Sequence, residues 1–185
     1  MSRPVGRLHE QTRQFLSFLR RAPLVRAQIC APKDGTLLYS GKMMRNAWEE
    51  IAELRERGAL PGLTTLPEVL ANIPAPETGH ATLQRYTEAT CQAVPWEDDG
   101  FIIWRALSGI FAAQAEGRVS FYIGAGISAD NDDLARRKVF AVTELRVLAR
   151  NPRIDTLTRD VLGYYLRCVE NRNHAMSFSF IGGGC

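Results

Sequence analysis

Two side chains in an apolar stretch of the chain have the types and the spacing that glycosyl-bond chemistry needs. Trp104 and Ser108 are four residues apart in the segment 101–112, so on a helix they lie on one face, one turn apart. An indole can stack on a flat cationic ring, and a hydroxyl beside it can meet a sugar carbon as its bond breaks. Taken alone, however, a Trp and a Ser in such a stretch are more often packing residues.

A lone carboxylate, Glu144, stands among apolar residues in the segment 139–145. Thr143 is expected to cap a helix that begins here, and the helix dipole favours an acidic residue in a first turn and lowers its pKa. That is the ordinary interpretation of Glu144. The functional one is that an ionised carboxylate facing a sugar ring stabilises the positive charge that develops there, by roughly 3–5 kcal/mol.

The order of these motifs resembles the ADP-ribosyl cyclase and NAD glycohydrolase family. That family has an aromatic residue followed by Ser, then Thr-Leu-Glu, then Trp-x-x-x-Ser followed by Phe-Ala, and finally Phe-x-x-x-Glu. This chain has Tyr39-Ser40, Trp104-x-x-x-Ser108 with Phe-Ala after it, and Phe140-Ala-Val-Thr-Glu144, in the same order. Three ordered matches favour membership.

The resemblance implies a role for each matching residue. Glu144 corresponds to the catalytic glutamate, Trp104 and Tyr39 to the aromatic walls that hold nicotinamide, and Ser108 to the residue that meets the ribosyl intermediate. The remaining expected substrate-binding residues are Ser40, Lys42, Glu68 and Phe140, of which Lys42 could contact a phosphate or simply be a solvated surface lysine. NAD or NADP is then the substrate, and no separate cofactor or metal is expected.

Two positions depart from the family pattern. Tyr39 stands where many relatives carry Trp, which keeps an aromatic face but adds a polar tip. Glu68 is one place later than the acid of Thr-Leu-Glu, with Pro67 in its slot. Because that second acid is thought to bias relatives between cyclisation and hydrolysis, the product is open; we expect hydrolysis to ADP-ribose, with cyclic ADP-ribose as a second product.

Other interpretations of the same residues remain. The chain could transfer ADP-ribose to a protein, since that chemistry breaks the same bond, or it could be a non-catalytic nucleotide-binding module. The segment 124–128, Gly-Ala-Gly-Ile-Ser, is similar to the opening of a sirtuin NAD site, but too few residues follow it for a dinucleotide-binding fold. We interpret it as a flexible loop.

Periodicity and turn residues predict an α+β or α/β fold, in which a largely helical N-terminal half packs on a small parallel sheet with flanking helices, like the ADP-ribosyl cyclases. We expect one catalytic domain: a helical lobe over about 1–95, an α/β lobe over about 96–181 and a tail at 182–185. The expected helices span 8–20, 42–57, a short segment from 64, 80–93, 101–115, 143–150 and 160–170. The expected extended segments or strands span 35–40, 118–124, 154–158 and 176–181.

Composition narrows the class of protein. The 185 residues carry a net charge of +3 with acidic and basic residues interleaved, which argues against nucleic-acid binding. Apolar runs are shorter than a membrane span, and the first residues lack the apolar core of a cleaved signal. The four cysteines are scattered, so free thiols are favoured over disulfides or zinc.

A short member of the family with this composition resembles a bacterial toxin or effector that depletes NAD. The expected location is therefore the cytoplasm, or secretion without a cleaved signal followed by action in the cytoplasm of a target cell. An immunity protein covering the substrate site is the partner that this resemblance implies.

Overall fold

The computed structural model describes residues 8–40, 44–75, 79–95, 99–123 and 143–160 and shows a mixed α+β fold. Side chains at positions 40, 44–48, 50 and 123 are not described. The elements are α1 (Glu10–Arg21), α2 (Pro23–Gln28), β1 (Thr36–Ser40), α3 (Met44–Glu56), α4 (Leu66–Ala71), α5 (Leu83–Gln92), α6 (Phe101–Gln114), β2 (Val119–Ile123) and α8 (Leu145–Leu148). The coarse prediction of helices with a small parallel sheet is thus confirmed.

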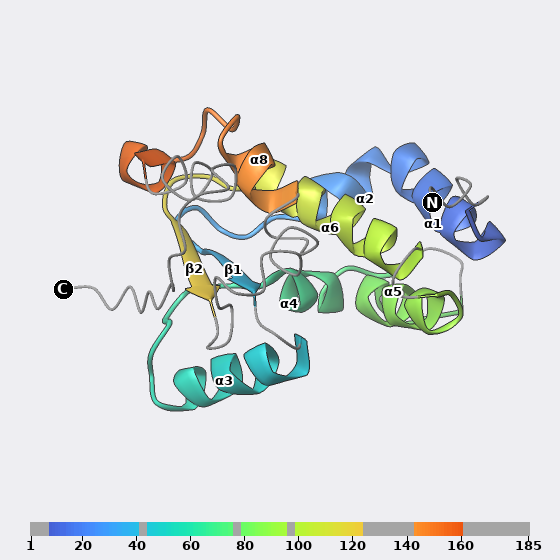
Figure 1. Cartoon of the computed structure of the whole chain (residues 1–185), viewed down its shortest axis with the longest axis horizontal. Coiled ribbons are helices and arrows are strands. Elements are labelled where there is room, and N and C mark those ends of the chain that lie inside the picture. Colours follow the sequence, from blue (N-terminus) through green and yellow to red (C-terminus); the bar gives the residue numbers. More distant parts are fainter. Residues whose placement is uncertain (1–7, 41–43, 76–78, 96–98, 124–142, 161–185) are drawn as a thin grey trace, which may run out of the picture.

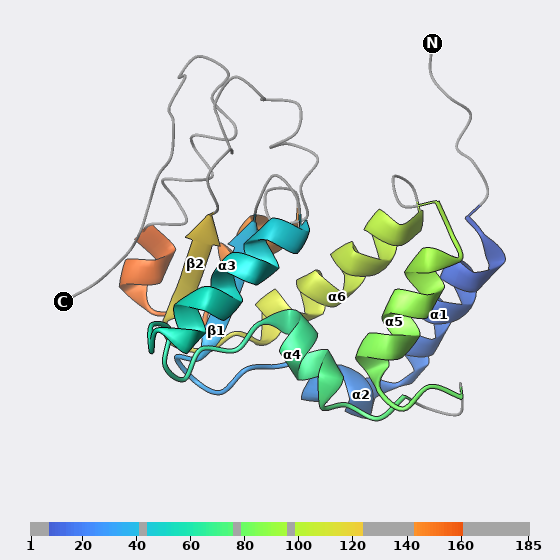
Figure 2. The same cartoon turned by 90° about the horizontal axis from the view of Figure 1, so that it is seen from below.

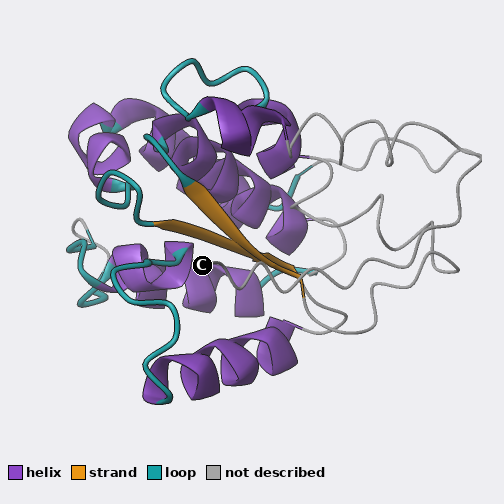
Figure 3. Cartoon of the chain, turned by 90° about the vertical axis from the view of Figure 1, so that its left-hand side faces the viewer, coloured by secondary structure: helices purple, strands orange, loops and turns teal. Residues whose placement is uncertain are grey.

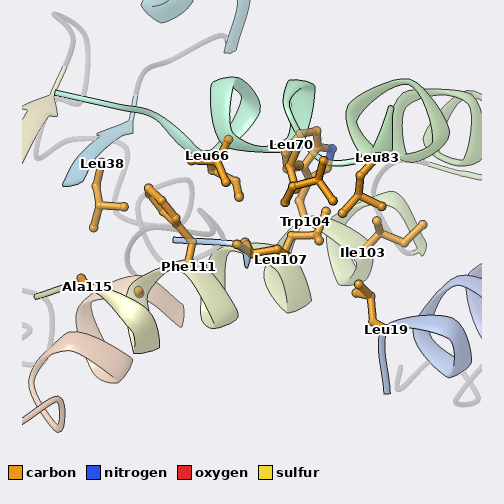
Figure 4. Close-up of a cluster of buried hydrophobic side chains, with 14 of the residues drawn as sticks. Leu19, Leu38, Leu66, Leu70, Leu83, Ile103, Trp104, Leu107, Phe111 and Ala115 are labelled. Atoms are coloured by element: carbon orange, nitrogen blue, oxygen red, sulfur yellow. The ribbon is translucent and has the colours of Figure 1, made fainter. Parts of the chain in front are cut away.

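Helix α6 runs through the middle of the molecule, with α1 and α5 near its first half and α8 and the sheet near its end (Figures 1 and 2). Its sequence is apolar nearly all round, as a helix covered by protein on most sides requires. Ile103, Leu107 and Phe111 have no exposed surface, and they contribute to one apolar core (Figure 4). The neighbours of α6 supply the rest of this core, among them Leu19, Leu38, Leu66, Leu70 and Leu83.

The sheet pairs a strand from each half of the chain. β1 and β2 are parallel, and Leu38 lies opposite Phe121 and Tyr39 opposite Tyr122 in the register. Leu37 and Leu38 are both buried although they point to opposite faces. Burial on both faces is typical of parallel strands, and Figure 3 shows helices on either side of the two strands.

The helix predictions hold to within a few residues, with one short helix missed. The helix predicted at 8–20 corresponds to α1, which ends at Arg21. A second helix, α2, begins directly afterwards at Pro23. A proline is well tolerated there because the first N–H of a helix has no helical partner. The predicted start of α4 is confirmed, with Thr65 at the N-cap and Pro67 in the first turn.

The strand predicted at 154–158 is wrong. Ile154 makes one isolated bridge with Gly117, and the chain is helical from 156 to 160. The Asp155 carboxylate accepts a hydrogen bond from the N–H of Thr158 at 2.6 Å, an arrangement that turns the backbone into a helix start. The prediction at 176–181 lies outside the described residues, as does that at 160–170 apart from its first residue.

Within the described residues, the longest and most apolar helix still falls short of what a membrane crossing requires.

Gly117 joins the end of α6 to the segment after α8. Its N–H donates to the carbonyl of Arg153 and its carbonyl accepts from the N–H of Asp155, both at 2.9 Å. Its φ is +73°, and a Cβ at this position would overlap the carboxylate of Asp34, which accepts from the N–H of Arg118 at 2.6 Å. Only glycine fits both the backbone conformation and the space.

Gly117→Ala should therefore destabilise the protein by about 2–4 kcal/mol, because the left-handed conformation costs about 1–2 kcal/mol and the displaced Asp34 carboxylate adds to it. Gly58→Ala is the matched control, since Gly58 has the same φ of +73° but open space around its Cβ. We expect it to cost about 1 kcal/mol. Urea denaturation of both variants measures the difference, and equal losses would contradict the steric part of the argument.

Candidate active site

The described site is built around the start of α8. Glu144 precedes this helix and is only 6 % exposed, and the hydroxyl of Ser108 on α6 lies near enough to lower the pKa of its carboxyl through hydrogen bonding. Ser108 is itself 5 % exposed, so both groups are withdrawn from solvent. The structure thus brings together two of the predicted catalytic residues, which are distant in sequence, and it does so through a direct contact between their side chains.

The pKa of Glu144 departs from the sequence prediction. Burial raises the pKa of this carboxyl from 4.5 to about 8, and the hydrogen bond from Ser108 lowers it by less. Removing a carboxylate from water disfavours its charged form. The expected lowering by a helix dipole is wrong because α8 has only four residues, whose aligned peptides cannot offset the loss of hydration.

Packing on α6 fixes the chain just before and after Glu144. Thr143 accepts a hydrogen bond at 3.0 Å from Nε of Arg105, and a Cβ on Gly109 would lie 3.4 Å from the Thr143 methyl group. Leu145 follows directly and is buried in the core. The small residue at 109 therefore lets the start of α8 approach α6 closely.

Tyr39 lies near the carboxyl end of β1, and the charges of two carboxylates affect the pKa of its phenol. Burial, then the nearby charge of Glu144, then that of Glu68 all raise the pKa of its phenol. The phenol is therefore neutral at physiological pH. β1 ends one residue later, at Ser40.

Glu68 has a structural role in the first turn of α4. Its Oε2 accepts hydrogen bonds at 2.8 Å from the Thr65 N–H, from the Thr65 hydroxyl and from Nη2 of Arg55. The side chain remains 32 % exposed. The structure thus shows a helix-capping acid where the sequence predicted a substrate-binding residue.

Trp104 is buried one turn before Ser108. Its indole lies near enough to Cys91 on α5 to lower the pKa of that thiol, and Figure 4 shows it beside Leu70 and Leu83. Burial raises the pKa of the Cys91 thiol to about 11, so this cysteine is a packing group and an acceptor and not a nucleophile. The indole is directed to α5, whereas the Ser108 hydroxyl is directed to α8.

Several predicted residues cannot be placed. Lys42 and Phe140 lie outside the described residues, as does the Gly-rich segment 124–128. Ser40 is placed in β1 opposite Ile123, although its side chain is not described.

Two contacts near the site were missed from the sequence. The sequence predictions give no role to Arg105 or Asn151. Asn151 is buried, and a buried amide needs a partner because a buried polar group without one is costly. The sequence could not name that partner.

Metal ligands and reactive thiols are two other kinds of group that could do chemistry in this protein. In the described part of the chain, no three side chains of His, Cys, Asp or Glu gather in a way that could hold a metal ion. Cys30 and Cys91 are free thiols, while Cys168 and Cys185 are outside the described residues. The chemistry available to the described site is therefore that of a buried carboxyl, a hydroxyl and a phenol.

A scan against models of protein families, a search of curated proteins and a search of solved structures each find no match to this chain. The functional argument therefore depends on the motifs and on the geometry of the site.

The raised pKa of Glu144 predicts how stability depends on pH. The unfolded chain loses this proton near pH 4.5 and the folded chain near pH 8, so the contribution to the free energy of unfolding is complete below 4.5 and lost as pH rises through 8. Glu144→Gln has no such proton. The free energy of unfolding of Glu144→Gln, relative to that of the natural protein, should therefore increase by about 3–5 kcal/mol as the pH rises from about 5 to about 9.

Urea denaturation at several pH values measures this gain. Glu56→Gln, which changes an exposed glutamate at the end of α3, is the control and should shift stability little at any pH. Parallel pH curves for the natural protein and Glu144→Gln would contradict the burial of an acid at this position.

Proposed function

We propose that this protein is an NAD(P) glycohydrolase that cleaves the bond between nicotinamide and ribose. The observation that carries the proposal is the buried Glu144 carboxyl with the Ser108 hydroxyl near it, because these two residues are the ones that the family resemblance assigns to catalysis. Tyr39, whose pKa the charge of Glu144 raises, is the aromatic residue that the resemblance adds. A structural explanation for a buried acid with one hydroxyl partner is weak, since an apolar residue would be more stable there.

In the proposed reaction the bond between C1′ of the ribose and the pyridinium nitrogen breaks, and its electron pair neutralises the nicotinamide ring. Positive charge then develops on the ribose, and the Glu144 carboxylate stabilises it. Water adds to C1′, its proton passes to a base or to solvent, and ADP-ribose is the product. Ser108 holds the carboxylate before the substrate arrives and lies beside the position proposed for C1′.

The positive charge on the substrate offsets the raised pKa of the resting acid. Glu144 is largely protonated at neutral pH in the free protein because it is buried. A nicotinamide ring that carries a positive charge favours the carboxylate and lowers that pKa once it binds. The acid thus ionises where its charge is needed, in a site that has already excluded water.

The position of Glu68 supports hydrolysis as the main outcome. Its carboxylate already accepts three hydrogen bonds from Thr65 and Arg55, and these tie it to the start of α4. An acid held in this way is poorly free to turn toward the adenine ring and promote cyclisation. We infer that ADP-ribose predominates and that cyclic ADP-ribose is minor.

The biological role that follows is depletion of NAD in a cell's cytoplasm by a toxin or effector. An immunity protein that blocks access to Glu144 is the partner that such a role calls for. Co-expression of a candidate immunity protein that restores growth and cellular NAD is the measurement that tests this part.

Purified protein should release nicotinamide from NAD, and Glu144→Gln should lower kcat by about 10²–10³-fold because the carboxylate faces the developing charge. Ser108→Ala should lower it by about 10–100-fold, the value of one hydrogen bond to a charged group. Glu56→Gln is the control and should keep full activity. Chromatography of the products with thermal melting of each variant measures both activity and folding.

The pH profile gives a second measure of the same experiment. We expect kcat/KM to rise with pH through about 8, because only ionised Glu144 acts in the free protein. Equal activity in the natural protein and Glu144→Gln would contradict the proposal. So would labelled protein after exposure to labelled NAD, which indicates a transferase, or stabilisation by NAD without turnover, which indicates a binding module.

Glu68→Gln should lower stability by about 1 kcal/mol, since it removes the ion pair with Arg55, and should leave the ratio of cyclic to linear product within about twofold. Arg55→Gln breaks the same pair from the other side and is the matched control. A change in product ratio with Glu68→Gln alone, measured by chromatography, would show that Glu68 contacts the substrate.

A further inference from the structure

Asn151 ties the end of α8 to the end of α6. Its Nδ2 donates to the carbonyl oxygens of Ala112, Ala113 and Ala115 at 3.1, 3.3 and 2.8 Å, and its Oδ1 accepts from the N–H of Arg153 at 2.9 Å. The side chain is only 5 % exposed. The last carbonyls of a helix have no helical donor, so this amide satisfies groups that would otherwise be buried without partners.

The backbone between Glu144 and Asn151 forms one hydrogen-bonded unit. The N–H groups of Ala149, Arg150 and Asn151 donate to carbonyls three or four residues earlier, at 2.9–3.1 Å. Leu145 and Leu148 anchor this unit in the core. Asn151 is therefore connected to Glu144 through α8 and the turn that follows it.

The two ends of this unit contact α6 in matching order. Glu144 meets Ser108, and Asn151 meets carbonyls that begin one turn later at Ala112. α6 and α8 therefore run in the same direction, and the segment 144–151 contacts α6 at both of its ends. Backbone hydrogen bonds hold each helix together. A shift of the segment 144–151 along α6 at one contact therefore also displaces the other contact.

We propose that Asn151 is a positioning residue, whose hydrogen bonds to the end of α6 set the register in which Glu144 faces Ser108. This deepens the proposed function and rests on it, since it assigns a residue that holds the catalytic carboxylate without contacting the substrate. Arg105 holds the other side of Glu144 through Thr143. Asn151 is the stronger of the two because its amide is buried and makes three contacts to one helix end.

The titration of Glu144 depends on its environment, so it reports on the position of α8 along α6 without any substrate. Among the described residues, the hydroxyl of Ser108 on α6 lowers the pKa of Glu144, the charge of Glu144 raises the pKa of Tyr39 on β1, and Arg105 donates to the neighbouring Thr143. When the register slips, the carboxyl loses its hydroxyl partner and gains contact with water. Its titration then moves toward that of an exposed glutamate.

The experiment compares Asn151→Ala with the natural protein, each with and without Glu144→Gln, by thermal melting at about pH 5 and about pH 9. In the natural background, Glu144→Gln should raise Tm more at the higher pH. In the Asn151→Ala background this pH-dependent difference should shrink by at least about half. With NAD, kcat should fall about tenfold or more while KM stays within about threefold.

Thr87→Ala is the matched control, because Thr87 is also buried and donates to a backbone carbonyl, that of Leu83 at 2.8 Å, on α5 away from α8 (Figure 1). It should lower Tm but keep both the pH-dependent difference and kcat. Asn151→Ser retains one donor and should recover part of both effects, and it replaces Asn151→Ala in the comparison should that variant not fold.

An Asn151 variant that lowers Tm but behaves like Thr87→Ala in titration and in kcat overturns the positioning role. Failure of the natural protein to release nicotinamide overturns the glycohydrolase assignment instead. The melting comparison uses no NAD, so the two outcomes are separable.

Discussion

The burial of the Glu144 carboxyl near the Ser108 hydroxyl is the constraint on which the rest of the site depends. A carboxyl group enclosed by protein resists ionisation, and one hydroxyl does not replace the water it has lost. The fold tolerates this cost because Leu145 and Leu148, on the same short helix, are fully packed in the core. A buried acid with a raised pKa is better explained by a role in a reaction than by a contribution to stability.

Helix α6 links the stability of the protein to this site. The same helix contributes Leu107 and Phe111 to the core and Ser108 to the site, and α1, α4 and α8 all pack against it. A helix held on several sides has little freedom to shift, which gives the hydroxyl a fixed position. Functional groups on such an element are more accurately placed than groups on loops.

The two glutamates near Tyr39 show how environment separates residues of one type. Glu68 is partly exposed and surrounded by donors from Thr65 and Arg55, whereas Glu144 is buried with the hydroxyl of Ser108. The first is suited to holding a helix start, the second to meeting a positive charge that appears only during a reaction. The charges of both acids raise the pKa of Tyr39, whose phenol therefore remains neutral.

Local patterns in the sequence determined most helix positions, the start of α4, and the spacing of Trp104 and Ser108 on one helix, because these depend on residues within a few turns of one another. The same patterns named Glu144 but gave the wrong direction for its pKa. They also predicted a strand at 154–158, where the tertiary structure has an isolated bridge at Ile154 and then the start of a helix. Only the tertiary structure decided that Glu144 meets Ser108, that Glu68 caps α4, and that Asn151 closes the end of α6. Burial and partners between distant segments set these properties, and a local pattern carries no record of which distant groups will exclude water.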